Sequence, residues 1–529
     1  MGRRDAEQRE GGFITDSAIK LYRSFMGWML PRPWLIFLAL IPLLIAGCYA
    51  YVKVGSGFMP TMDEGGFILD YVAPSGTSLE ETDRLLRQVE AIVRSTPEVD
   101  TYSRRTGLQL GGGLTEANRG DFFIRLKPLP RRPIEEVMDD VRTRVEHTVP
   151  GLEIETAQLM EDLIGDLTSV PEPIEVKLFC DDQKTLEATA PKIAEAIGKV
   201  NGVVEVKSGI VAAGDALNIQ VDRVKAALEG MNVDDITKSL NDMLSGNVAT
   251  QIQEGPKLVG VRVWLPKSSQ RSILDIGNLL LRNANGHVFP LSRVATITPV
   301  TGQPELNRED LKRMAAVTGR IENRDLGSAV ADVKAVLDKP GLMPANVYYV
   351  LGGLYEQQRI AFRGLMIVLV AAVLLVFGIL LFLYESFRVA IAMLLLPLLA
   401  MAAVFIGLFL TKTELNITAM MGMTMIVGIV TEVSIFYYSE FEELESDSAF
   451  DRFITAGSNR MRPIAMTTLA AMLALMPLAL GIGQGSAMQQ PLAIAIISGL
   501  AAQLPLVLIV LPSLLALFRV KPNPSTASG

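Results

Sequence analysis

Long apolar runs constrain the fold of this chain more than any other feature of its sequence. Six runs of about 20 residues or more lie at 33–52, 365–383, 389–410, 417–438, 463–481 and 491–518. A helix of this length crosses the hydrocarbon core of a bilayer. Half of all 529 residues are hydrophobic. We therefore expect an α-helical membrane bundle of six transmembrane helices.

Basic residues between the runs predict the orientation. On the side of the N-terminus lie Arg388, Arg452, Arg460, Arg462, Arg519 and Lys521, whereas only Lys412 falls in a short loop on the other side. Positive residues favour the cytoplasmic side. Residues 1–32 are charged and amphipathic rather than a cleavable signal, so we expect a retained first span at 33–53 and both termini in the cytoplasm. The region between the first two spans would then be periplasmic in a Gram-negative cell.

That region alternates between short strands and helices. The pattern predicts strands at 67–73, 99–106, 121–126 and 152–156, with helices at 78–95 and 133–147. A second cycle has strands at 174–179, 203–207, 313–321 and 347–351, with helices at 184–200 and 326–337. Each cycle is a split βαβ sandwich, and the second is interrupted by an insert. We assign 54–170 to the first unit, 171–215 and 301–360 to the second, 216–300 to the insert, 361–519 to the remaining five helices and 520–529 to a tail.

Several function classes have no support in the sequence. The formal net charge of −8 does not favour a nucleic-acid partner. The glycines at 111–113 and 352–353 lack the helix and lysine of a phosphate-binding loop, and the two histidines lack metal-ligand spacing. Since neither a nucleophile nor a cofactor motif stands out, we expect no enzyme activity and no cofactor.

One carboxylate interrupts the fourth apolar run. Glu432 lies inside 417–438, where an ionised side chain costs roughly 2.5 to 3.5 kcal/mol on insertion scales. Such groups usually face a bundle interior and mark a proton or ion path. The alternative is that Glu432 snorkels or bonds within the bundle.

Short motifs resemble a known family. They are Phe58-Met59-Pro60, Met62-Asp63-Glu64-Gly65, the turn at 73–78, Tyr384-Glu385-Ser386 and the stretch 462–467. Together with the order of spans, these motifs resemble the second half of a resistance-nodulation-division (RND) efflux transporter, nearest its heavy-metal and cation branch. The resemblance implies two ferredoxin-like porter subdomains and an inserted docking subdomain.

Only one of the family's two halves is present. The resemblance therefore implies a partner, either a first-half RND subunit or a missing N-terminal half. It also implies a trimer in the lipid of the bacterial inner membrane, working with a periplasmic adaptor and an outer-membrane channel.

The resemblance further implies roles for particular residues. Glu432 corresponds to the titratable position of the family's tenth span, and Thr467 to a hydroxyl partner in its proton relay. Thr467 could equally bond its own helix backbone. The substrate cleft would lie between the two units, where acidic residues are Asp70, Asp121, Glu161, Asp162 and Asp166.

The identity of the cargo stays open. Asp70, Arg119 and Gly165 occupy positions where the copper and silver branch has methionines, so that soft-metal set is missing. Carboxylates suit a harder cation or a cationic organic molecule, although solvated surface charge is an equal alternative. We expect proton-driven efflux of cations, heavy metals or toxic compounds by alternating access. The alternatives are a multidrug or lipid exporter and a non-transporting receptor or scaffold.

Overall fold

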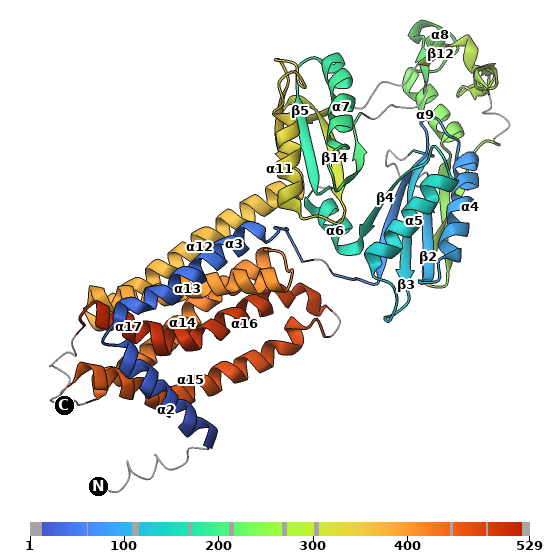
Figure 1. The fold of residues 1–529 in the computed structure, drawn as a ribbon. Coiled ribbons are helices and arrows are strands. Elements are labelled where there is room, and N and C mark those ends of the chain that lie inside the picture. Colours follow the sequence, from blue (N-terminus) through green and yellow to red (C-terminus); the bar gives the residue numbers. More distant parts are fainter. Residues whose placement is uncertain are drawn as a thin grey trace.

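A computed structural model describes residues 13–60, 62–107, 116–168, 172–210, 216–266, 272–300, 306–444, 448–482 and 485–520. The chain forms a long helical bundle and a separate α/β region beyond one end of that bundle (Figure 1). Asp166 belongs to a described helix, but its side chain lies outside the described residues.

Six helices among the described residues are long and apolar enough to cross a membrane. They are α3 (Ile36–Lys53), α12 (Gly353–Tyr384), α13 (Phe387–Leu410), α14 (Ile417–Glu443), α15 (Ala449–Ala479) and α16 (Gln490–Pro505), which continues through a π-helical turn, Leu506–Val510, into α17 (Leu511–Leu517). Their shared core lies mainly between α13, α14 and the last of these helices. The amphipathic α2 (Phe13–Met29) packs against α15.

Two of these helices begin earlier than the apolar runs do. α12 starts at Gly353 and α15 at Ala449, whereas the runs start at 365 and 463. An apolar run marks only the apolar part of a helix, and polar N-terminal turns can belong to the same helix. Pro463 consequently lies inside α15 instead of opening it.

The first α/β unit is an antiparallel four-stranded sheet with two helices. Its elements are β1 (Gly66–Val72), α4 (Leu79–Ser95), β2 (Val99–Thr106), β3 (Arg119–Leu126), α5 (Ile134–Thr148) and β4 (Glu153–Gln158). The strand order is β2-β3-β1-β4, as a split βαβ connection requires. Ser78 accepts a hydrogen bond from the backbone of Glu81 and thereby caps α4. Both helices pack on one face of the sheet (Figure 1).

The second unit repeats this plan. It contains β5 (Ile174–Phe179), α7 (Gln183–Ile197), β6 (Val203–Lys207), β14 (Lys312–Ile321), α11 (Leu326–Leu337) and β15 (Tyr348–Gly352), with β13 (Asn307–Glu309) added at the edge. A short helix, α6 (Leu159–Thr168), follows β4 and lies between the units (Figure 1). The sequence pattern did not predict α6.

The insert has its own small core. β7 (Ala216–Val221) pairs with β12 (Ala295–Val300), beside α8 (Arg223–Leu228), α9 (Val233–Leu244), α10 (Ile273–Gly277) and the pair β10 (Leu280–Arg282) and β11 (Val288–Pro290). β8 (Asn247–Glu254) and β9 (Lys257–Val263) form an exposed hairpin.

A connector at 54–58, which we call the strap, joins the bundle to the α/β region. Ser56 forms a parallel bridge with Leu415 just before α14, and the backbone N–H of Ser56 donates to Asp325 at 3.1 Å. Gln358 of α12 donates to the carbonyl of Gly57. The strap therefore contacts α12, the start of α14 and the second unit at once.

Candidate functional site

A row of ionisable residues crosses the first sheet. Asp121 on β3, Asp70 on β1 and Glu155 on β4 lie directly opposite one another in register, and Arg105 on β2 extends the row beyond Asp121. Nε of Arg105 donates to Asp121 at 2.7 Å. We call Asp121, Asp70 and Glu155 the acidic row.

Alternation along the strands explains where the row lies. Phe67, Leu69 and Tyr71 of β1 pack into the core beneath α4 and α5. Side chains alternate between the two faces of a sheet, so Asp70 points to the face without these helices. α6 packs over β1 and β4, which brings Asp162 into the electrostatic field of Asp70.

Asp70 occupies the middle of the row without an ion pair among the described residues. Burial, followed by the negative charges of Glu155, Asp162 and Asp121, raises the pKa of Asp70 to about 7. Lys207 partly offsets this rise. Asp70 is thus a carboxyl group that exchanges a proton near neutral pH.

Arg320 of β14 reaches from the second unit into this region. Its side chain is only 9% exposed and faces four carboxylates. The distances are 3.1 Å to Glu155, 2.6 Å to Glu161, 3.4 Å to Glu172 and 3.7 Å to Glu205. Because Glu155 and Glu161 belong to the first unit and α6, Arg320 holds the two units together.

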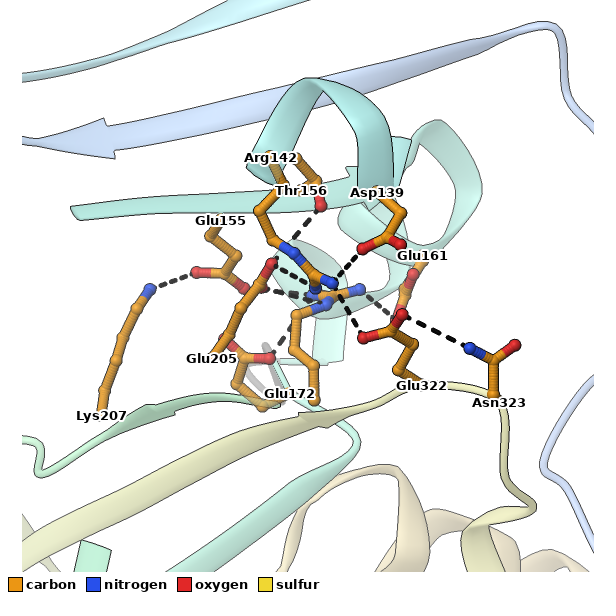
Figure 2. Close-up of polar contacts among 11 residues, drawn as sticks. Asp139, Arg142, Glu155, Thr156, Glu161, Glu172, Glu205, Lys207, Glu322 and Asn323 are labelled. Carbon is orange, nitrogen blue, oxygen red and sulfur yellow. Dashed lines mark hydrogen bonds and ion pairs between the residues drawn. The ribbon is translucent and has the colours of Figure 1, made fainter. Parts of the chain in front are cut away.

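Two further basic side chains form ion pairs between the first and the second unit (Figure 2). Arg142 of α5 pairs with Glu205 at 3.2 Å and with Glu322 at 2.8 Å, both on the second unit. Lys207 of β6, on the second unit, pairs with Glu155 of β4, on the first unit.

Glu155 and Glu172 lie close enough to form one coupled pair. Burial and the neighbouring Glu155 raise the pKa of Glu172. Burial opposes ionisation of Glu155 as well, but its hydrogen bond with Glu172 and the charges of Lys207 and Arg320 outweigh this effect and lower its pKa. Of the two, Glu172 is therefore the carboxyl group that holds a proton more tightly.

A cavity of about 990 Å³ opens where the units meet the outer end of the bundle. Its lining includes Glu135, Glu136, Asp139, Glu161, Glu205, Glu322, Asp325 and Glu414, together with Lys53, Arg142, Arg320, Arg324 and Lys412. Acidic groups outnumber basic ones in this set, eight to five. Such a cavity favours cations over anions.

Glu432 lies on the exposed side of α14. Met421, Met425, Gly428, Glu432 and Phe436 are all exposed and recur at helical spacing, whereas most residues on the other faces of α14 are buried. We call these five residues the open stripe. Glu432 makes no hydrogen bond or ion pair with the described part of the chain.

Thr467 on α15 is exposed, and its hydroxyl donates to backbone carbonyls of its own helix, those of Pro463 and Ile464, both at 3.1 Å. The structure contains no hydrogen bond between Thr467 and Glu432. The relay role of this pair stays a prediction.

The structure brings Asp70, Asp121 and Asp162 together around one surface. Within the described residues, however, no group of three His, Cys, Asp or Glu side chains is arranged to hold a metal ion. Sequence reasoning missed Glu155, Lys207 and Arg320. Their strands were predicted, so an assumed ferredoxin-like strand order could have placed Glu155 beside Asp70.

These features define a membrane protein with paired α/β units beyond one end of its helical bundle. The AcrB/AcrD/AcrF family model matches residues 3–519, and the chain belongs to this family of RND transporters. It is a multi-pass membrane protein.

Curated relatives include proteins for metals and for drugs. The chain is 27% identical over 453 residues to the cobalt-zinc-cadmium resistance protein CzcA of Cupriavidus metallidurans, covering 83% of this chain and 42% of that protein. It is 27% identical over 500 residues to the multidrug resistance protein MdtC of Erwinia tasmaniensis, covering 92% of this chain and 47% of that protein. The chain thus spans about half the length of these relatives.

The fold also matches a solved structure. The crystal structure of a heavy metal efflux pump superimposes with a TM-score of 0.79 at 24% identity, covering 96% of this chain and 53% of that one. At this identity the match establishes the fold.

Proposed function

We propose that this chain is one half of a proton-driven efflux transporter that exports cations across the bacterial inner membrane. The observation that carries the proposal is the position of Glu432, in the middle of an apolar helix and on its open stripe. An ionised carboxylate facing lipid there costs roughly 2.5 to 3.5 kcal/mol. The open stripe is therefore covered by another transmembrane unit, and Glu432 loads and releases a proton at that contact.

The covering unit is a first-half RND subunit or the corresponding N-terminal half of a longer chain. Support comes from the relatives, of which this chain spans about half. Three pairs of halves would form the family's trimer, which passes cargo to a periplasmic adaptor and an outer-membrane channel. The α/β region would be periplasmic.

The acidic row and Asp162 are the proposed cargo site. Carboxylate oxygens suit divalent cations of intermediate or hard character better than the soft ions that prefer sulfur. The name of CzcA, a cobalt-zinc-cadmium resistance protein, points toward divalent cations. Alternating access would separate the two units and expose the row to the periplasm.

A second candidate cargo is a lipophilic organic cation. A smaller cavity of about 230 Å³ is lined by Met59, Met62 and Met160 beside Glu64 and Glu414. Flexible thioether side chains adapt to varied apolar ligands. The resemblance to MdtC adds to this candidate.

Cross-linking from the open stripe tests the proposal. In a Cys48→Ser background, the full chain with Met425→Cys is treated with a membrane-permeable benzophenone–maleimide in its native host and irradiated, so that the thiol-bound benzophenone inserts into C–H bonds of whatever polypeptide lies beside it, and captured polypeptides are identified by mass spectrometry. Met423→Cys is the matched control, because Met423 lies on the same helix but is buried. We expect Met425→Cys alone to capture a polypeptide with further apolar spans. Labelling of Met425→Cys by a lipid-phase reagent, without capture, would contradict the proposal.

A further inference from the structure

The strap lies between two carboxylates that belong to different parts of the molecule. On one side Asp325, at the start of α11 in the second unit, accepts from the backbone N–H of Ser56 at 3.1 Å and from that of Ser328 at 2.9 Å. On the other side lies Glu414, in the loop that leads into α14. A Cβ atom at Gly57 would collide with the Glu414 carboxylate, so glycine is what allows this carboxylate to lie directly against the strap.

Backbone hydrogen bonds fix the strap to both neighbours. The backbone of Leu415 donates to the carbonyl of Gly55 at 2.8 Å and accepts from Gly57 at 3.1 Å. On the opposite side, Gly327 of α11 donates to the carbonyl of Ser56 at 3.1 Å. The outer end of α14, the strap and the start of α11 are thus joined in series, so a displacement of one moves the others.

Glu414 differs from Asp325 in having no partner. Within the described residues it makes no hydrogen bond or ion pair, although it is half-buried and lines both cavities described above. Burial, followed by the negative charge of Asp325, raises the pKa of Glu414. Burial opposes ionisation of Asp325 too, but its hydrogen bonds and the charge of Arg324 outweigh this effect and lower its pKa. Asp325 therefore stays ionised where Glu414 exchanges a proton with solvent.

Charged groups from several neighbouring elements line the same two cavities. Besides Asp325 they include Lys53 of α3, Glu64, Glu161 of α6, Arg324 and Lys412. The remaining charged groups of the larger cavity, named above, lie on the two α/β units. Asp325 is the charge whose field acts on Glu414, so the two carboxylates repel each other across the strap when both are ionised.

We propose that Glu414 and Asp325 form a proton-dependent contact between the bundle and the second unit. With a proton on Glu414 the two carboxyl groups stay together across the strap, in the arrangement seen here. Loss of that proton to solvent places two negative charges in a partly desolvated space, and their repulsion drives the second unit away from the outer end of α14. The inference rests on the proposed function, since it links external protons to the movement of the units that alternating access requires.

Distance measurement by double electron–electron resonance tests this contact in the full chain, held in lipid nanodiscs. Spin labels are attached at Ala335→Cys on α11 and at Leu410→Cys at the end of α13, both exposed, in a Cys48→Ser background in which Cys180 is buried. We expect the ratio of a longer to a shorter distance to rise about tenfold between pH 5.5 and pH 8.5. Such a rise corresponds to a difference of about one in the pKa of Glu414 between the two arrangements.

Glu414→Gln keeps the size of the side chain but cannot ionise, so we expect the shorter distance at both pH values. Glu443→Gln is the matched control, because Glu443 is exposed at the other end of α14, and it should respond to pH as the labelled chain does. The proposal is overturned if Glu414→Gln responds like the labelled chain, or if pH leaves the distances of the labelled chain unchanged.

Asp325→Asn tests the same contact from the other side and does not depend on whether Glu414→Gln folds. Asparagine still caps α11 but carries no charge, so the shorter distance should persist at pH 8.5. A full pH response in Asp325→Asn would overturn the proposal.

Glu432→Gln separates this inference from the proposed function. If Glu432→Gln abolishes the change of distance and Glu414→Gln does not, the contact is rejected and the proposed proton role of Glu432 stands. A pH response that only Glu414→Gln and Asp325→Asn remove, together with an open stripe that meets lipid alone, would keep the contact and reject the proposed function.

Discussion

Arg320 and Glu155 join the two α/β units directly, with Nη1 of Arg320 donating to Oε1 of Glu155 at 3.1 Å. The arginine comes from β14 and the glutamate from β4, which belong to different sheets. Because the guanidinium is buried among carboxylates, removing any one of these charged groups leaves another buried charge without its partner.

Replacing Arg320 by Met should destabilise the α/β region by about 3 to 5 kcal/mol, since it leaves buried carboxylates without their counter-ion. Differential scanning calorimetry of the purified chain would detect a lower melting temperature. Arg308→Met is the control, because Arg308 is exposed at the edge strand β13. Equal melting temperatures for both variants would show that Arg320 does not hold the units together.

Asp70 should make stability fall with rising pH. Its pKa is raised to about 7 in the folded chain from an ordinary value of 3.8, so the folded state binds more protons than the unfolded state between these values. Stability is therefore lost as the pH rises through this window. Asp70→Asn removes the loss and should stabilise the protein by up to about 4 kcal/mol at pH 8, with little effect near pH 4.

Thermal unfolding midpoints at both pH values would check this prediction. Asp100→Asn serves as the control, because Asp100 is an exposed carboxylate on β2 of the same sheet. If Asp70→Asn gained the same stability at both pH values, titration of Asp70 could not be the cause of the gain.

Asp325 should couple the strap to the second unit. Its carboxylate caps α11 by accepting from the backbone of Ser328 at 2.9 Å, and it also accepts from Ser56. Asp325→Ala should cost about 1 kcal/mol as a lost cap and should also reduce transport. Asp182→Ala removes the cap of α7, which makes no hydrogen bond to the strap in the described part of the chain, and is expected to cost similar stability with transport retained.

Measurement of cation efflux beside melting temperature separates the two effects. Asp325→Asn should keep the cap, because asparagine caps as well as aspartate. Equal transport in Asp325→Ala and Asp182→Ala would mean that the contact between Ser56 and Asp325 does not couple the strap to the second unit.

Much of the fold could be predicted from periodicity. The apolar runs indicated the long helices, and alternation with capping indicated elements such as α4 within one or two residues. The exceptions have physical causes. The start of α15 is polar, and β8 is exposed on all its residues, so neither carries the apolar pattern on which such predictions depend.

The candidate site was predictable only in part. Asp70, Asp121 and Asp162 were singled out as acidic residues of a cleft, and the structure brings them together. Glu155, Lys207 and Arg320 were not, because their importance arises from pairing between strands distant in sequence, which a local pattern does not contain.

If Glu432 carries protons for cation export, a side chain of the same size that cannot titrate should not support transport. Glu432→Gln keeps the size of the side chain and removes its titration. The measurement is Co²⁺-driven proton movement in inverted membrane vesicles that contain the chain and its partner half, with Phe436→Leu on the same open stripe as the control. We predict that Glu432→Gln reduces this movement to background while assembly with the partner half is preserved, and that Phe436→Leu retains it. Proton movement at the wild-type rate in Glu432→Gln would contradict the account.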